Sequence, residues 1–499
     1  MTHYAYERLS ALDSTFLVIE GPNVQMHVAS TAIFEPGPLA TPDGGVDIDR
    51  ITAYVASRLH KIPRYRQRLA YIPIERHPVW VDDERFNLHY HIRHTRLPRP
   101  GDERQLKRMV GRINSQELDR GKPLWETWIV EGLADGRFAM ISKVHHCMID
   151  GISGVDLLSV LLSPTSDPPP AEEVRWIPRP VPSPMTLLRD EAVERLNAPL
   201  GLIARAFREP GKLLRDVREG IEAVGETVAA GMHLTSDTPF NQPVGPHRRF
   251  DWSAMDLSHL QEVRHTLGGS LNDVVLAIVA GAVGRFLERR GVVAETIDFR
   301  AFVPVSLRQA EERGQMGNRV AGWMVDLPIG ERDPRKRLAA VQETTARLKQ
   351  SKQARGSEIL TEVLDWTGSA VLSIGMRLAA QGHPYNIVVT NVPGPPRPLY
   401  LLGARMLEIF PLVPLFVNQA LGIALFSYAG RLFWGFNSDW DVVPDLHDFV
   451  SAIEASFEEL CRAAPEPVRK RREKTTLRSD NGSVAAPVNV RDATVRLQS

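Results

Sequence analysis

The chain has 499 residues, and 60 lysines and arginines balance 60 aspartates and glutamates to give a formal net charge of zero. Nucleic-acid-binding proteins usually carry a basic excess, so this balance argues against a nucleic acid as the partner. Hydrophobic residues make up 43% and charged residues 24%, a globular composition that excludes a largely disordered chain. A chain of this length is expected to fold as two domains.

Cysteine content and hydropathy indicate a cytoplasmic protein. Cys147 and Cys461 are too few for a disulfide framework or a cysteine-rich zinc site. The N-terminal residues include Glu7 and Asp13 and only a short apolar run, unlike a secretory signal. The most apolar stretch, residues 274–284, falls short of the roughly 20 residues that cross a bilayer, and it is typical of a buried helix.

Residues 1–163 alternate between strand-like and helix-like patterns and form the first predicted domain. Residues 138–144 contain no glycine or proline and predict a buried strand. Residues 153–162 follow as a predicted short helix with leucines on one face.

Residues 86–94 carry three histidines in an alternating pattern. Apolar Phe86 and Ile92 alternate with polar neighbours, which predicts a half-buried strand. We therefore interpret His89, His91 and His94 as strand residues rather than metal ligands.

Residues 164–239 are predicted to connect two domains. Eight prolines between positions 164 and 184 prevent regular helix or interior strand, so this part is a linker. Residues 187–233 then show helical spacing of apolar side chains opposite charged ones. This amphipathic stretch either packs on its own protein or meets a membrane or lipid-body surface.

Residues 240–464 form the second predicted α/β domain. An apolar helix is expected over 274–287, and strands over 302–305, 386–390, 421–428 and 432–436. The apolar run 407–416, broken by two prolines, either lines a channel for an acyl chain or packs in the core. A cleft between two such domains would be a favoured ligand site.

Residues 465–499 are predicted to be a disordered basic tail, because they hold eight basic and four acidic residues in a polar background. The neutral total therefore combines a slightly acidic body with a basic end, which we hypothesise binds an anionic membrane surface.

The sharpest chemical signal is the pattern HHxxxDG, formed by His145, His146, Asp150 and Gly151. It follows the strand predicted over 138–144, at the edge where α/β proteins present active-site groups. Adjacent side chains on extended backbone point to opposite sides, so we expect one histidine to face a cleft and the other the interior. An imidazole can accept a proton from a hydroxyl near neutral pH.

Less specific interpretations of this pattern also exist. A pair of histidines is more often a packed or surface feature than a functional one. Histidine and aspartate are metal ligands, but adjacent histidines rarely coordinate one ion, and no further ligand is evident. We therefore predict no metal site.

With its flanking segments, the pattern resembles a known family. HHxxxDG is the signature of the CoA-dependent acyltransferase superfamily, which includes chloramphenicol acetyltransferase and condensation domains. The chain is similar to the bacterial wax ester synthase/diacylglycerol acyltransferase family in particular. The segments that carry this resemblance are 9–17, 26–29, 123–125, 270–274, 304–308 with 317–318, 391–395 and 427–430.

The resemblance implies two chloramphenicol-acetyltransferase-like α/β domains around a central channel. It implies that His146 is the general base that deprotonates an acceptor hydroxyl as this attacks the thioester of acyl-CoA. His145 would be a structural neighbour, and Asp150 would shape the loop through an unidentified arginine. No covalent acyl-enzyme is implied, so Cys147 would be a small buried side chain. Acyl-CoA would be a co-substrate, no cofactor is expected, and the acceptor would be diacylglycerol or a long-chain alcohol.

Acyl transfer also needs a donor for the developing oxyanion. Asn272 is the candidate for this role, although an asparagine or aspartate here would equally cap the helix that follows. Two other functions stay open: a related acyltransferase that uses a carrier-protein donor or another acceptor, and a non-catalytic protein that binds lipid bodies.

Overall fold

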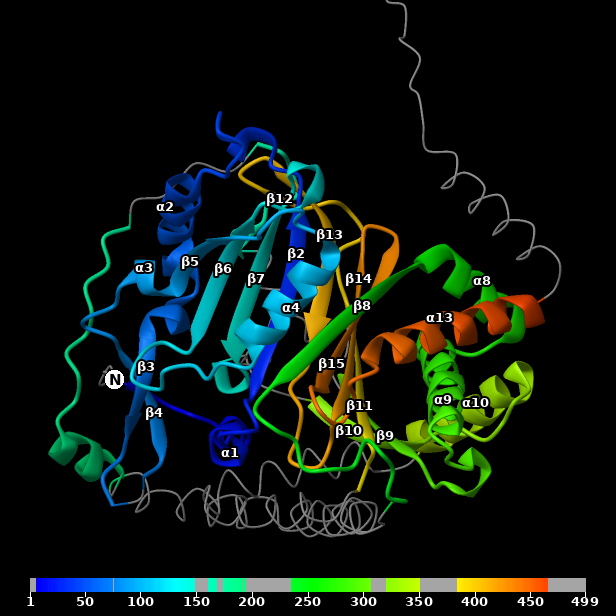
Figure 1. Ribbon diagram of the computed structural model, residues 1–499. Coiled ribbons are helices and arrows are strands. Elements are labelled where there is room, and N and C mark those ends of the chain that lie inside the picture. Colours follow the sequence, from blue (N-terminus) through cyan, green and yellow to red (C-terminus); the bar gives the residue numbers. More distant parts are fainter. Residues whose placement is uncertain are drawn as a thin grey trace, which may run out of the picture.

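Figure 1 shows the computed structural model of the chain, in which β-sheets are combined with helices. The structure describes residues 6–74, 76–148, 160–167, 174–191, 193, 235–306, 320–350 and 384–464. Within these ranges there are two six-stranded sheets and one three-stranded sheet. The mixed α/β class predicted from the sequence is confirmed.

The first large sheet contains the strand that ends at the two histidines. Its strands, in spatial order, are β12 (Tyr400–Leu401), β13 (Ala404–Leu412), β2 (His27–Phe34), β7 (Phe138–His145), β6 (Trp125–Glu131) and β5 (Ile92–Arg96). As predicted, β7 is a buried strand, and it lies between β2 and β6. Its apolar sequence is that of a strand covered on both faces.

Two helices cover the opposite faces of this sheet. Side chains of α2 (Ile48–Arg58) line an apolar cavity together with Met140, Ser142 and Val144 of β7. On the other face, Lys143 donates to a carbonyl at the end of α4 (Glu103–Asn114). Side chains of a strand alternate between faces, so His145 lies on the α4 face with Lys143.

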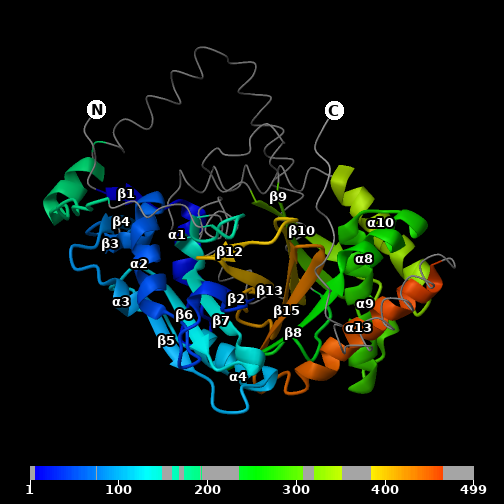
Figure 2. The same cartoon turned by 90° about the horizontal axis from the view of Figure 1, so that it is seen from above.

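The second large sheet is covered by a group of helices (Figures 1 and 2). Its strands, in spatial order, are β10 (Val320–Asp326), β9 (Arg300–Ser306), β11 (Ile387–Pro393), β14 (Leu421–Tyr428), β15 (Arg431–Asp439) and β8 (Arg248–Asp256). The helices are α8 (Leu257–Leu267), α9 (Leu271–Arg289), α10 (Pro334–Gln350) and α13 (Leu446–Ala463). The predictions of α9, β9, β11, β14 and β15 are confirmed.

Two strands from the second half of the chain belong to the first sheet. β13 pairs with β2, so that Phe410 lies opposite Thr31. It also crosses β15, where any side chain at Gly435 would collide with the carbonyl of Pro411. Residues 400–412 of the predicted second domain therefore pair in the sheet of the first half of the chain, and such pairing between distant segments leaves no local pattern in the sequence.

The apolar run 407–416 falls mainly in this exchanged strand. Ile409, Phe410 and Leu412 are buried in the core cluster of the first sheet. The sequence left open whether this run lines a channel for an acyl chain or packs in the core. These three side chains pack in the core.

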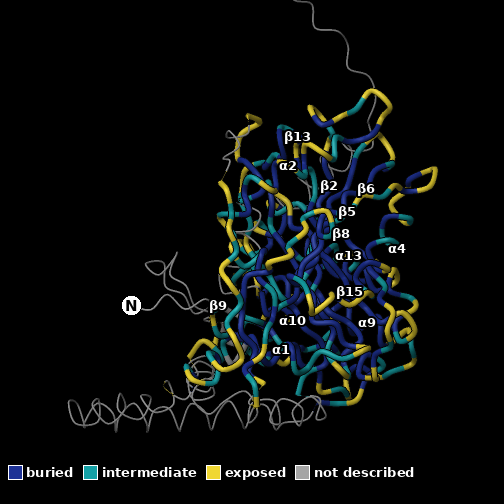
Figure 3. Tube along the Cα trace, turned by 90° about the vertical axis from the view of Figure 1, so that its left-hand side faces the viewer, coloured by how far each residue is buried: buried dark blue, intermediate teal, exposed yellow. Residues whose placement is uncertain are grey.

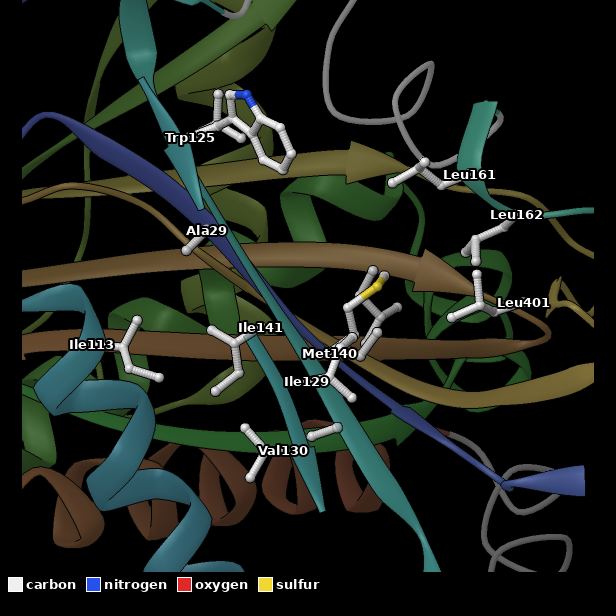
Figure 4. Packing of buried hydrophobic residues seen from close by; sticks show 14 of the residues in the cluster. Ala29, Ile113, Trp125, Ile129, Val130, Met140, Ile141, Leu161, Leu162 and Leu401 are labelled. Atoms are coloured by element: carbon white, nitrogen blue, oxygen red, sulfur yellow. The ribbon is translucent and has the colours of Figure 1, made fainter. Parts of the chain in front are cut away.

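Each large sheet carries its own apolar core, and buried segments form the centre of the fold in Figure 3. Figure 4 shows part of the first core, where Ile113 of α4 and Ile141 of β7 lie together. Phe16 of α1 (Ala11–Ile19) packs against both cores. Helix α1 therefore lies where the two halves of the molecule meet.

The third sheet is small and peripheral. It consists of β1 (Tyr6–Arg8), β4 (Pro78–Asp82) and β3 (Gln67–Tyr71). Part of the proline-rich linker is attached to it, because Arg179 forms an ion pair with Asp82, with 2.8 Å between Nη2 and Oδ1.

The strand predicted over residues 86–94 is wrong in its first half. Leu88–His91 forms one helical turn, α3, and the strand β5 starts only at Ile92. The side chain of Asn87 accepts a hydrogen bond from the backbone N–H of His89, at 3.1 Å. An asparagine at a helix start competes with strand pairing in this way, although the alternating apolar pattern favours a strand.

Several predicted segments lie outside the described residues. They are most of the helix over 153–162, most of the amphipathic stretch over 187–233, and the tail over 465–499.

Within the described part of the chain, no single helix is long and apolar enough to span a membrane. The pair α8 and α9 meets the length and composition requirements only together, and the two helices meet at 98°.

Candidate active site

The two histidines of the HHxxxDG pattern stand where β7 ends and a short 3₁₀ turn, η5 (His146–Met148), begins. The backbone N–H of His145 donates to the carbonyl of Leu124, at 2.9 Å, and that of His146 donates to Met26, at 2.8 Å. Segments before both neighbouring strands thus hold the pair. The two side chains are fixed in position by a backbone that is anchored on both sides.

His145 is buried, and its contacts define its protonation. Its side chain is 1% exposed. The backbone N–H of Cys147 donates to its Nδ1, at 3.1 Å, and the Cys147 thiol sulfur lies 2.9 Å from the same atom. Since Nδ1 is an acceptor, the proton of the neutral ring is on Nε2.

A buried carboxylate faces that proton. Oε1 of Glu20 lies 3.3 Å from Nε2 of His145 and 3.5 Å from Nε2 of His27, whose residue pairs with His145 across β2 and β7. Oε2 of Glu20 accepts from Arg120, at 2.7 Å from Nη2. Burial and the positive surroundings lower the pKa of His27 well below its ordinary value, so this ring is neutral.

His146 has different surroundings from His145. The residue is partly exposed, but its ring is withdrawn from water and stacks on Phe16 of α1, with 3.8 Å between ring centroids and 24° between planes. Removal of the ring from water, and then the neighbouring His145, lower its pKa to about 4. At neutral pH the ring is therefore an unprotonated base. The two histidines thus differ in exposure, and the role of His146 as the base stays a prediction.

The ring nitrogens of His146 are not equivalent. Nδ1 is buried and has no hydrogen-bond partner among the described residues. A buried nitrogen cannot reach a substrate, so a base at this position acts through Nε2.

Asp150 and Gly151, the other members of the pattern, lie outside the described residues. Cys147 is buried, and burial raises the pKa of its thiol well above the ordinary value. A protonated, buried thiol is a poor nucleophile.

Asn272 lies in the first turn of α9, but it does not cap the helix. Ser270 is the capping residue, and Asp273 completes a reciprocal capping box. The exposed side chain of Asn272 instead accepts a hydrogen bond from Asn391 of β11, with 2.7 Å between Nδ2 and Oδ1. Because Oδ1 is engaged, the amide N–H₂ of Asn272 keeps donors for another group.

The three histidines of residues 86–94 do not form a common site. His91 is buried, stacks on Trp125 and bonds to its carbonyl through Nδ1, at 2.8 Å. His94 contacts Glu131 instead, at 3.2 Å. Within the described ranges, no group of three or more histidine, cysteine, aspartate or glutamate residues is arranged to hold a metal ion.

An open cleft of about 500 Å³ leads to the carboxylate beside His145. Its lining side chains are mostly charged or polar and include Glu20, Arg93, Glu126 and Arg120. The apolar cavity under α2 is, in contrast, closely packed, and Trp125 and Met140 of its lining appear in Figure 4.

Two family models match this chain. The wax ester synthase/diacylglycerol acyltransferase catalytic domain matches residues 9–275, and the C-terminal domain of the same family matches residues 316–461. The chain belongs to the wax ester synthase/diacylglycerol acyltransferase family. The first match contains the His145–His146 pair, and it extends into the first turn of α9.

Relatives of known name cover nearly the whole chain. A putative diacylglycerol O-acyltransferase of Mycobacterium tuberculosis CDC 1551 is 33% identical over 471 residues, which span 93% of this chain and 91% of the relative. The probable diacylglycerol O-acyltransferase tgs1 of Mycobacterium tuberculosis H37Rv is 32% identical over 453 residues, which span 89% and 94%.

Solved structures support the same fold. The wax ester synthase/diacylglycerol acyltransferase of Marinobacter aquaeolei VT8 matches with a TM-score of 0.65 and 25% identity, over 91% of this chain and 98% of that one. The starter condensation domain of rhizomide synthetase matches with a TM-score of 0.55 and 13% identity, over 91% and 94%, which shows likeness of fold alone. The acyltransferase fold predicted from the sequence is confirmed.

Four side chains around the pair were not predicted as site residues: Phe16, Glu20, His27 and Arg120. Phe16 and His27 lie in segments that carry the family resemblance, and Glu20 lies between these segments. The only sign of Glu20 in the sequence was an acidic residue a few positions before His27. It could not be linked to His145 because the two are far apart in the sequence.

Proposed function

We propose that this chain transfers the acyl group of acyl-CoA to the hydroxyl of diacylglycerol, of a long-chain alcohol, or of both, with His146 as general base. Family membership supports the reaction class. The observation that carries the role of His146 is the contrast within the pair. His145 is buried, with Nδ1 accepting the Cys147 N–H and Nε2 3.3 Å from Glu20, whereas His146 is a partly exposed residue whose ring is unprotonated at neutral pH.

The proposed reaction is a single direct transfer. Nε2 of His146 accepts the proton of the acceptor hydroxyl while that oxygen attacks the thioester carbonyl carbon. The tetrahedral intermediate collapses with cleavage of the carbon–sulfur bond, and the CoA thiolate takes the proton back from the imidazolium. The products are an ester and free CoA, so the reaction needs no cofactor and no covalent acyl-enzyme.

Asn272 is the proposed donor to the developing oxyanion or to the bound substrate. Asn391 occupies its carbonyl oxygen, which leaves the amide N–H₂ to donate. Its position in the first turn of α9 also adds the positive end of the helix dipole. Asp150 and Gly151 keep their proposed role in shaping the loop after the pair.

The role of His146 can be tested by substitution. His146→Ala removes the base, and we expect the turnover number for acyl transfer to fall by about 10²–10⁴-fold, the usual contribution of general base catalysis. The matched control is His89→Ala, because the His89 side chain is exposed on α3, and its activity should equal that of the wild type. Near-normal turnover by a folded His146→Ala variant would contradict the mechanism.

Two other functions have less support than acyl transfer from acyl-CoA. No contact among the described residues points to a carrier protein as the acyl donor. The condensation domains that match this chain are similar to it in fold alone. A non-catalytic lipid-body protein leaves the two histidines and their distinct surroundings without a role.

We also propose that the protein meets its lipid substrates at an inner membrane surface or a lipid body. The basic tail over 465–499 and the amphipathic stretch over 187–233 support this proposal by sequence. Binding to anionic vesicles should weaken with salt and be lost on truncation before Pro465. Unchanged binding after truncation would remove the tail from the proposal.

A further inference from the structure

The carboxylate of Glu20 connects three parts of the chain beneath the two histidines. Glu20 caps the C-terminal end of α1. Its Oε2 accepts from both Nε and Nη2 of Arg120, at 3.0 and 2.7 Å, and Nη2 of Arg120 also donates to the carbonyl of Leu17, at 2.9 Å. This guanidinium therefore fixes both the carboxylate and the end of α1.

The other carboxylate oxygen faces the histidine pair. Oε1 accepts a hydrogen bond from the backbone N–H of Met26, at 3.2 Å. It also lies within hydrogen-bond distance of Nε2 of His145, at 3.3 Å, although the two groups are imperfectly aligned. The two carboxylate oxygens of Glu20 thus have different partners. Oε2 accepts from Arg120, and Oε1 faces Met26 and His145.

Glu20 stays ionised although it is buried. Its side chain is 9% exposed, and burial alone would raise its pKa. The contact with His145 and the hydrogen bonds from Arg120 outweigh burial and lower the pKa of Glu20 below its ordinary value. At any working pH, Oε1 is therefore an acceptor only, and it requires a donor on each neighbour.

We propose that Glu20 is a positioning residue for acyl transfer, which fixes His145 in its Nε2–H form and holds the backbone that presents His146. The inference rests on the proposed function, because its readout is acyl transfer.

Three contacts transmit the effect of Glu20 to His146. Met26, whose N–H bonds to Glu20, accepts the N–H of His146 on its own carbonyl, at 2.8 Å. Phe16, which stacks on the His146 ring, belongs to the helix that Glu20 ends and Arg120 clamps. His145, the residue before His146, has Nδ1 facing a Cys147 N–H and Nε2 facing Glu20. A shift of the His145 proton from Nε2 to Nδ1 would place two donors face to face at Cys147 and leave Glu20 without a donor from His145.

Glu20→Gln is the most informative substitution because it changes charge and hydrogen-bonding but not shape. In this variant the side-chain oxygen of the glutamine takes the Oε2 position, because Nε and Nη2 of Arg120 both donate there. The amide N–H₂ then occupies the Oε1 position, where it opposes the N–H of Met26 and Nε2–H of His145. Two donors facing each other in a buried site must move apart, and His146 moves with them.

Removal of Arg120 should partly reverse this effect. In Glu20→Gln/Arg120→Met no guanidinium holds the amide oxygen, so the amide can rotate and offer that oxygen to Met26 and His145. A purely structural Glu20–Arg120 ion pair makes the opposite prediction: the double variant would be no more active than Glu20→Gln. The matched control is Glu343→Gln, an exposed carboxylate of α10 outside the cleft, which should have wild-type activity.

The experiment measures steady-state acyl transfer by each purified, folded variant at a temperature well below unfolding. We expect Glu20→Gln to lose about 10²-fold in kcat, the usual cost of a small misplacement of a reacting group, with KM for acyl-CoA unchanged. The double variant should be about tenfold more active than Glu20→Gln, a coupling typical of groups in one network. Wild-type kcat in Glu20→Gln, or a double variant at or below it, would overturn the inference.

Two further measurements keep the test decisive. If Glu20→Gln does not fold, Glu20→Asp, which keeps the charge but withdraws it by one methylene, should lower kcat at unchanged KM, and wild-type kcat would overturn the inference. If the wild type transfers no acyl group, the proposed function fails, but the positioning role is still tested by histidine-selective ¹⁵N NMR. The signal absent in His145→Gln should report an Nε2–H ring, and an Nδ1–H ring would overturn the inference.

Discussion

At the scale of single residues, two neighbouring histidines acquire different properties from their surroundings. His145 accepts a backbone hydrogen bond on Nδ1 and faces an ionised carboxylate with Nε2. His146 stacks on Phe16 and has a pKa of about 4, so its ring is unprotonated at neutral pH. The same type of side chain is thus held by buried contacts at one position and is the proposed base at the next.

The lowered pKa of His146 predicts an unusual dependence on acid. The base is active when unprotonated, so kcat/KM for acyl transfer should stay level as pH falls from neutral to about 5. It should then drop as pH falls through about 4, rather than near the ordinary histidine value of 6.5. A pH–rate profile measures this, and an acid limb near 6.5 would contradict the assigned surroundings of His146.

Folding stability provides a control for this profile. In the unfolded chain His146 binds a proton near pH 6.5, whereas in the folded protein it does so only near 4. The unfolded state therefore holds more protons between these values, and the free energy of unfolding decreases as pH falls from 6.5 towards 4. Circular dichroism at each pH separates loss of the fold from protonation of the base.

At the scale of elements, the candidate residues gather where regular structure begins or ends. The histidine pair follows β7, and Asn272 lies in the first turn of α9. Lys143, on the α4 face of β7, donates to the carbonyls of Ile113 and Gln116, at 3.1 and 3.0 Å. This buried ammonium satisfies carbonyls at the end of α4 and so fixes that helix beside the sheet that carries His145.

Two residues at the start of α9 are predicted to have different roles, Ser270 in stability and Asn272 in acyl transfer. Ser270→Ala removes the cap and should lower the free energy of unfolding by about 1 kcal/mol without loss of acyl transfer. Asn272→Ala should change unfolding by less than about 0.5 kcal/mol but lower kcat by about 10²-fold, the cost of one oxyanion donor. Chemical denaturation and steady-state assays check both. Full activity in Asn272→Ala would show that this residue only links α9 to β11.

At the scale of the whole molecule, elements with a local sequence pattern could be predicted, whereas pairings between distant segments could not. The strand β7 is predicted from a largely apolar segment without glycine or proline, and the helix α9 from a long apolar run. HHxxxDG is placed at the end of β7 because it follows this strand directly in the sequence. The exchange of β13 into the first sheet leaves no local trace. Glu20 also gave no local signal, because its partners Arg120 and His145 are brought to it only by the fold.

An acceptor panel with the purified 499-residue chain tests the proposed acyl transfer most directly. Acyl-CoA of several chain lengths is offered with diacylglycerol, with hexadecanol, and with no acceptor, while ester and free CoA are quantified. We expect ester and CoA in equal amounts with at least one acceptor, and almost none without. No ester above the protein-free background with either acceptor, from a folded protein, would contradict the proposed acyl transfer.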